Sequence, residues 1–206
     1  MTRVDNVTDD ILADYRKSYG SGVTKDEIFY YVYGILHSPA YRNEFAADLK
    51  KMLPRIPKVK DFQGFSRAGR ALSELHIGYE GVEPYGLVET ISDAAPDREL
   101  YQVQKMAFAK GKDRATIIYN NHITVSGIPD EAYRYTLGAK SAIDWIMERY
   151  QVTVHKDSQI RNDPNDWATE HGQPRYILDL LKRIVTVSVE TMNIVDNLPD
   201  LELLVQ

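Results

Sequence analysis

The 206-residue chain contains no cysteine, which excludes disulfides, thiolate metal sites and cysteine nucleophiles. No apolar run approaches the roughly 20 residues that a membrane span requires. Residues 1–10 are polar and acidic and lack the hydrophobic segment of a signal peptide. We therefore expect a cytoplasmic protein that does not enter a membrane.

Motifs for metal binding and nucleotide hydrolysis are also missing. The five histidines lie far apart without HExxH spacing, so no metal site is predicted. A Walker-type GxxxxGK[ST] sequence is absent, which excludes that route to nucleotide hydrolysis. His155, Asp157 and Ser158 are neighbours in sequence, but a catalytic triad needs a geometry that such proximity does not supply. A polar turn is the better interpretation.

Two further segments resemble catalytic motifs incompletely. Pro96-Asp97 precedes QVQK at residues 102–105, as in PD…(D/E)xK nucleases, but glutamine replaces the second metal-binding acid. NDPNDW at residues 162–167 resembles the NPPY loop of adenine methyltransferases, yet it lacks the consecutive prolines and a Gly-rich cofactor turn. This segment favours a structural turn. We predict no catalytic residue and no cofactor site in this chain.

Charge does not by itself indicate a nucleic-acid partner, because the formal net charge is -5. The basic residues nevertheless form two groups in the sequence. They are Lys50, Lys51, Arg55, Lys58, Lys60, Arg67 and Arg70, and then Lys105, Lys110, Lys112 and Arg114. Two interpretations stay open: a DNA-facing surface with an acidic back, or ordinary solvated helix faces and turns.

The first third of the sequence predicts helices. Thr24 and Glu27 have capping-box spacing and begin a helix that ends near His37. Ser38-Pro39 begins a second helix. Its predicted buried stripe consists of Tyr41, Phe45, Leu49 and Met52. After the extended segment 54–57, a third helix is expected from about residue 62 to residue 77. Residues 1–78 are therefore predicted to form a helical unit.

The remainder predicts a mixed fold. Residues 79–98 contain Gly and Pro without periodicity and are predicted as a connector. Strand-like segments at 101–108, 116–119 and 123–125, with turns at 110–113 and 120–121, predict an antiparallel β-meander. A helix over 140–150, a polar loop over 157–173 and a long helix over 175–197 complete residues 99–206. The expected class is α+β.

Several stretches resemble the C-terminal specificity domain of type ISP restriction-modification enzymes. They are YYVYGILHSPAYR (30–42), LPRIP (53–57), FSRAGR (65–70), IIYN (117–120), ITVSGIP (123–129), AIDWIMERYQV (142–152) and NDPNDW (162–167). The helical part with LPRIP is also similar to target-recognition regions of type IIG and related adenine methyltransferases. The resemblance covers residues 27 to about 197.

This resemblance implies a parent protein with nuclease, helicase-like ATPase and N6-adenine methyltransferase parts that use magnesium, ATP and S-adenosylmethionine. The present chain would supply sequence choice on double-stranded DNA, next to the methyltransferase and helicase domains. A structural or protein-interaction module that braces the parent is the alternative.

The meander turns are the expected DNA-contacting positions, because flexible polar tips on a rigid sheet often carry recognition. Lys and Arg suit phosphates, whereas Arg and Asn can present two hydrogen-bonding groups to base edges. The predicted DNA-binding residues are Lys110, Lys112, Arg114, Asn120, Asn121, His122, Arg67 and Arg70. The alternative for Asn120-Asn121 is that asparagine simply tolerates the backbone of a tight hairpin.

Overall fold

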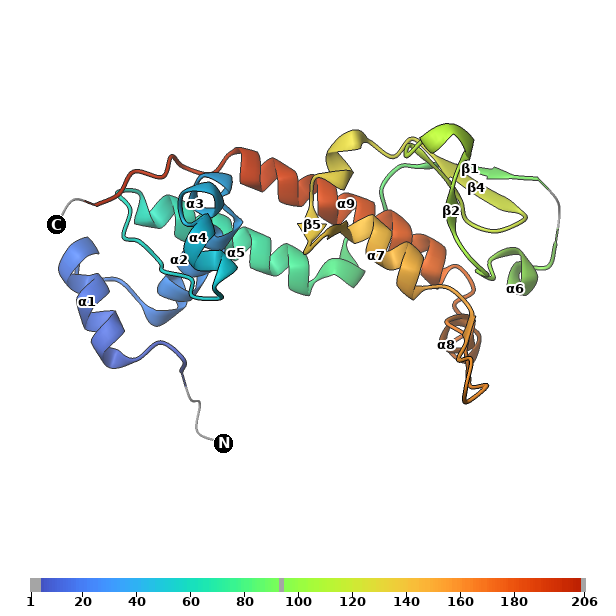
Figure 1. Ribbon diagram of the computed structural model, residues 1–206, viewed down its shortest axis with the longest axis horizontal. Coiled ribbons are helices and arrows are strands. Elements are labelled where there is room, and N and C mark those ends of the chain that lie inside the picture. Colours follow the sequence, from blue (N-terminus) through green and yellow to red (C-terminus); the bar gives the residue numbers. More distant parts are fainter. Residues whose placement is uncertain (1–4, 93–94, 205–206) are drawn as a thin grey trace. The chain divides into compact units, whose positions relative to one another are not determined.

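The computed structural model describes residues 5–92 and 95–204, and the chain divides into two compact units (Figure 1). Unit 1 consists of Met1–Ile77 together with Asn193–Gln206, and unit 2 consists of Gly78–Met192. Each unit has its own cluster of buried hydrophobic side chains. The last residues of the chain therefore belong with the first helices.

Unit 1 is helical, as the sequence predicted. Its elements are α1 (Asp9–Tyr19), α2 (Lys25–His37), α3 (Pro39–Glu44), α4 (Ala46–Lys50) and α5 (Phe62–Ile77). The backbones of α2 and α5 approach each other closely at two glycines. A Cβ atom at Gly69 would lie 1.8 Å from the Tyr30 oxygen, and one at Gly34 would lie 2.4 Å from the Phe65 oxygen. Only glycine fits at either position.

Two predicted helix starts are confirmed. The Thr24 hydroxyl accepts a hydrogen bond from the Glu27 N–H, completing a capping box, and the Ser38 hydroxyl accepts one from the Tyr41 N–H. The second predicted helix is divided into α3 and α4 and ends before Met52, whose side chain is exposed rather than buried. The helix α1 was not predicted at all.

Tyrosine hydroxyls hold the extended segment 55–59 in unit 1. The Tyr41 hydroxyl donates to the Arg55 oxygen at 3.0 Å, and the Tyr19 hydroxyl donates to the Val59 oxygen at 2.8 Å. The Tyr31 hydroxyl donates to the Pro57 oxygen at 2.5 Å and accepts from the Val59 N–H at 3.2 Å. This non-helical backbone thus obtains hydrogen bonds that secondary structure does not provide.

Unit 2 combines a small sheet with helices. Its strands are β1 (Val88–Ile91), β2 (Ala107–Phe108), β3 (Thr116–Ile118), β4 (Ile123–Ser126), β5 (Thr136–Leu137), β6 (Lys140–Ser141), β7 (Thr153–Val154) and β8 (Arg161–Asn162). Its helices are α6 (Asp97–Leu100), α7 (Ala142–Arg149), α8 (Asn165–Glu170) and α9 (Tyr176–Asp196), with 3₁₀ turns η1 (Tyr79–Gly81), η2 (Lys110–Lys112) and η3 (Asp130–Tyr133). The last residues of α9 belong to unit 1.

The predicted antiparallel meander is present as β2–β3–β4 within a sheet of order β1-β4-β3-β2. In register, Ile117 pairs with Val125 and Phe108 pairs with Ile117. The predicted apolar face of the long helix packs in the same core, through residues that include Ile177, Leu181 and Val185. The predicted α+β fold is therefore confirmed.

Three local predictions in unit 2 are wrong. The stretch 79–98, predicted as a connector, contains β1, which pairs along β4. The stretch 157–173, predicted as a loop, contains β8 and α8. The first predicted meander strand, 101–108, is regular only at β2, and its earlier residues are irregular.

Strand β1 is tied to α9 by an ion-pair network. The Glu89 carboxylate accepts hydrogen bonds from Arg175 at 2.9 Å and from Lys182 at 2.6 Å. Burial alone would raise the pKa of Glu89, but the two cationic donors lower it overall.

In the part of the chain that the structure describes, no helix is long and apolar enough to cross a membrane.

We expect Tyr31→Phe to lower the free energy of unfolding by about 1–3 kcal/mol, because it leaves the Pro57 oxygen and the Val59 N–H without their partner. Urea denaturation followed by circular dichroism measures the change. Tyr30→Phe on the same helix is the matched control and should change stability by less than about 0.5 kcal/mol. Equal effects of the two substitutions would contradict the role given to the Tyr31 hydroxyl.

We also expect unit 1 to lose stability in mild acid. Burial lowers the pKa of His76 to about 4, and burial also lowers the pKa of His37, whose ring centroid lies 5.5 Å from that of His76. The unfolded chain therefore binds more protons between about pH 6.5 and pH 4, so stability is complete above this range and falls as the pH falls through it. Denaturant midpoints measured across this range should fall less for His76→Gln than for wild type. An equal fall in His76→Gln and wild type would contradict this assignment.

Candidate nucleic-acid interface

The first meander turn presents a basic tip. The residues between β2 and β3 form η2, in which Gly111 adopts a φ of 84°, a conformation that favours glycine. The Lys110 side chain is exposed on this turn. The side chain of Lys112, the second predicted lysine, lies outside the described part of the structure. The turn therefore offers at least one solvated cation next to the sheet.

The second meander turn depends on Asn120, which is buried. Its side-chain oxygen accepts from the His122 N–H at 2.9 Å and the Ile123 N–H at 2.7 Å. Its side-chain nitrogen donates to the Leu100 oxygen at 2.8 Å and to the Gln102 oxygen at 2.9 Å. These four bonds use the whole amide. Its hydrogen-bonding groups already serve the fold, which argues against the predicted contact of this side chain with DNA.

The neighbours of Asn120 are more accessible. Asn121 is exposed at the tip of the turn. His122 is half-buried, and its main-chain oxygen accepts a hydrogen bond from the Ser92 N–H at 2.9 Å. The His122 Nδ1 atom is buried and has no hydrogen-bond partner among the described residues. Of the three predicted residues in this turn, only Asn121 is exposed.

Arg114 is engaged by its own unit. Its guanidinium contacts both carboxylate oxygens of Asp144 at 3.0 and 2.9 Å and lies 4.1 Å from the centre of the Tyr133 ring. Burial would raise the pKa of Asp144, but hydrogen bonds from Ser141 and Arg114 lower it overall. Because Asp144 also completes the capping box of α7, Arg114 holds the start of this helix against the sheet.

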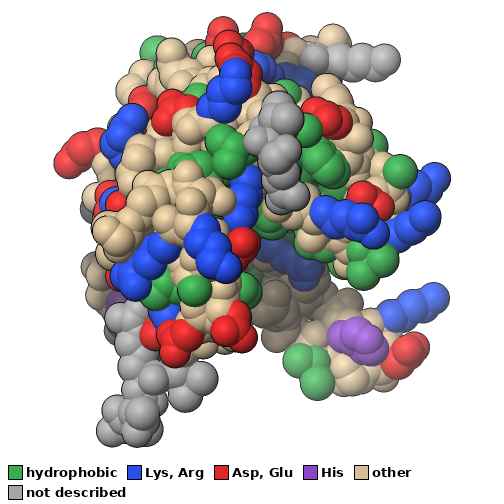
Figure 2. All heavy atoms as spheres, turned by 90° about the vertical axis from the view of Figure 1, so that its left-hand side faces the viewer, with side chains coloured by type: hydrophobic (Ala, Val, Ile, Leu, Met, Phe, Trp, Pro, Cys, Tyr) green, Lys and Arg blue, Asp and Glu red, His purple; other side chains and the backbone are tan. Residues whose placement is uncertain are grey.

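The predicted arginines Arg67 and Arg70 are exposed on α5 and belong to unit 1. The Arg70 guanidinium lies 4.1 Å from the centre of the Tyr30 ring. The predicted DNA-binding set is thus divided between the two units. The face drawn in Figure 2 likewise carries separate groups of Lys and Arg side chains interleaved with acidic ones, rather than one continuous basic surface.

The segments that resembled catalytic motifs have structural roles. Ser158 Oγ lies 3.0 Å from His155 Nδ1 in an exposed turn. The His155 N–H closes this turn by donating a hydrogen bond to the Ile160 oxygen. In NDPNDW, buried Asn165 accepts from the Val103 N–H and donates to the Val103 oxygen, both at 2.8 Å. This bonding supports a structural role for the segment, although its last three residues begin α8 rather than forming a turn. No group of three or more metal-ligating side chains occurs within residues 5–92 and 95–204.

Sequence reasoning missed the β7–β8 hairpin and the apolar side chains that it exposes. Val154 and Ile160 are exposed there, and Trp167 of the following α8 stacks on His171 at 4.1 Å between ring centroids. The signal was available in the alternation around residues 152–161, but the polar residues between the two strands favoured a loop.

Family comparison identifies what kind of domain this is. Residues 1–180 match the family described as the Type ISP C-terminal specificity domain. The chain belongs to this family. No curated protein matches this specificity domain significantly.

Solved structures agree with that assignment. The domain resembles a nuclease-deletion mutant of the Type ISP enzyme LlaGI in complex with a DNA substrate mimic, with 44% identity and a TM-score of 0.80 over 88% of this chain. It also resembles the ATP-dependent Type ISP enzyme LlaBIII bound to DNA, with 36% identity and a TM-score of 0.83 over 93% of this chain. The DrdV–DNA complex is similar at 36% identity and a TM-score of 0.79 over 96%.

The specificity domain spans only a small part of these relatives. The aligned region covers 17% of the LlaGI chain, 12% of the LlaBIII chain and 20% of the DrdV chain. The relatives are therefore several times longer than the 206 residues of this chain.

We expect Asn120→Ala to destabilise unit 2 by about 2 kcal/mol or more, because several buried main-chain groups lose their partner at once. The adjacent Asn121→Ala should change the free energy of unfolding by less than about 0.5 kcal/mol. Denaturant titration of both variants provides the comparison. If both substitutions were equally mild, the structural assignment of Asn120 would be wrong.

Proposed function

We propose that this specificity domain binds double-stranded DNA and supplies sequence choice to a larger restriction-modification protein. The observation that carries the proposal is the similarity over 88–96% of the chain to proteins solved in complex with DNA. The rigid sheet with solvated turn tips is consistent with this role, because recognition residues are commonly placed on such tips. We infer no catalytic step for the domain itself.

Within unit 2, we assign the contact to the two meander turns. Lys110, with Lys112 in the same turn, would neutralise phosphates, and Asn121 would present its amide to base edges. Asn120 and Arg114 would act indirectly, by holding the turn and the start of α7 in place. His122 would lie beside these tips as a partly buried neighbour.

The remaining activities would belong to other parts of the parent protein. We propose a parent in which nuclease, helicase-like ATPase and N6-adenine methyltransferase segments use magnesium, ATP and S-adenosylmethionine, with the methyltransferase and helicase parts next to this domain. Residues 1–78, 79–98 and 99–206 would then work as one specificity domain in the cytoplasm, where the DNA substrate lies.

We expect the purified chain to bind a short random-sequence duplex with an affinity that falls steeply between about 50 and about 200 mM salt, because phosphate contacts release counterions. Fluorescence anisotropy measures this affinity. Lys110→Gln should weaken binding about threefold by removing one phosphate contact. Lys17→Gln, an exposed lysine on α1 of unit 1, is the matched control and should bind as wild type.

An absence of binding at both salt concentrations would contradict DNA binding by the isolated domain. It would favour a structural role in which the domain supports the rest of the parent protein. Binding that is independent of salt and of Lys110 would also oppose the proposal, since a phosphate-contacting reader must depend on both.

A further inference from the structure

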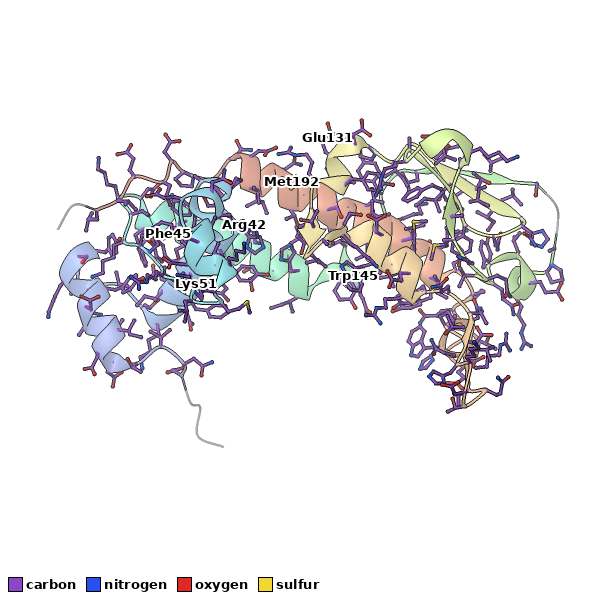
Figure 3. All side chains as sticks on the ribbon, in the orientation of Figure 1. Arg42, Phe45, Lys51, Glu131, Trp145 and Met192 are labelled. Atoms are coloured by element: carbon purple, nitrogen blue, oxygen red, sulfur yellow. The ribbon has the colours of Figure 1, made fainter. Side chains whose placement is uncertain are left out.

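A second exposed corner, on unit 1, combines large apolar and basic side chains. We define the elbow as residues 50–55, which begin at the last residue of α4. Met52 and Leu53 are 85% and 61% exposed as residues, and the Arg55 side chain is 79% exposed. Figure 3 labels Lys51 of this elbow and Arg42 of the preceding α3. Large apolar side chains and cations thus lie together in solvent.

The backbone of the elbow turns the Met52 side chain outward in an energetically unfavourable left-handed conformation. The Met52 N–H donates to the Leu49 oxygen at 3.0 Å and the Leu53 N–H donates to the Asp48 oxygen at 3.1 Å, which is a Schellman ending of α4. Met52 occupies the left-handed position of this motif, with a φ of 58°. Glycine is the favoured residue there, so stability alone would not select methionine.

A hydrogen bond and ring packing from α3 also fix the position of the elbow. The Tyr41 hydroxyl donates to the Arg55 oxygen at 3.0 Å, and the Tyr41 ring stacks on Phe45 with 5.0 Å between ring centroids. The Arg42 Nε donates to the Leu36 oxygen at 2.8 Å. A pre-positioned surface loses little conformational freedom when it binds a partner.

The charges around the elbow favour a polyanionic partner. Lys50 and Lys51 are exposed, and neither forms an ion pair with any residue that the structure describes. Arg55 approaches Asp48 only to 3.9 Å. An apolar patch alone would suit a protein partner, but unpaired lysines around it would be costly to bury in a protein interface and are useful beside phosphates.

We propose that the elbow is a second DNA-contacting site, which binds the duplex backbone without regard to sequence. Lys50, Lys51 and Arg55 contact phosphates, while Met52 and Leu53 pack on the apolar faces of the sugars in the groove. The proposal rests on the proposed function, since it requires that the domain bind DNA. It adds a contact in unit 1 to those assigned to the meander turns of unit 2.

The test measures duplex affinity by fluorescence anisotropy for the double variant Lys50→Gln/Lys51→Gln and for Met52→Gly, with Lys17→Gln as the control in the same unit. The double variant should lose about tenfold in affinity for every duplex sequence and should reduce the slope of log affinity against log salt by about 2. Met52→Gly should raise the midpoint of thermal unfolding, because glycine relieves the left-handed strain, while it weakens binding. A merely structural residue would not move these two quantities in opposite directions.

The outcomes separate this site from the meander turns. If both elbow variants bind as wild type while Lys110→Gln weakens binding, the elbow proposal is overturned and the proposed function stands. If the wild-type chain binds no duplex at all, both are overturned. Lysine loss that weakens binding, with no effect of Met52→Gly, would overturn the apolar part of the contact.

Discussion

The structure depends on satisfying the main-chain hydrogen-bonding groups of irregular segments by side chains from elsewhere in the sequence. In unit 2 the stretch 100–104 begins at the last residue of α6 and belongs to no strand. The Asn120 side-chain nitrogen donates to two carbonyl oxygens of this stretch, those of Leu100 and Gln102. The Asn165 amide bonds both polar groups of Val103, and the Tyr119 hydroxyl donates to the Tyr101 oxygen at 2.8 Å. Without these bonds, each unpaired buried group would cost about 1–3 kcal/mol.

In unit 1 the main-chain groups of the irregular segment are hydrogen-bonded by tyrosine hydroxyls instead of asparagine amides. A tyrosine can bury its ring in the core and still place a hydroxyl at an irregular backbone, so one residue serves both packing and hydrogen bonding. Tyr31 is buried and bonds both Pro57 and Val59. The segment that begins at the elbow is therefore fixed by the core itself, which explains why a surface loop there can stay ordered with exposed apolar side chains.

The sequence predicted what is encoded locally and failed where a partner lies far along the chain. The caps at Thr24 and Ser38 were found because each bonds a residue three positions later. The helix α1 also had local signals, with Thr8 as N-cap and acids in its first turn, and these were overlooked. The strand β1 was missed because its partner β4 lies much later in the sequence and because Glu89 is stabilised by Lys182 of α9 and by Arg175 just before it.

Candidate site residues illustrate the same limit. Two adjacent asparagines in a turn are equivalent in sequence, and local chemistry allows either to read bases or to cap a hairpin. The fold distinguishes them, because Asn120 faces the irregular stretch 100–104 and Asn121 faces solvent. Positions that hold the backbone are therefore separate from positions free to bind. Under the proposed function, such a separation would allow the exposed tips to change, and with them the recognised DNA, without loss of the hydrogen bonds on which folding depends.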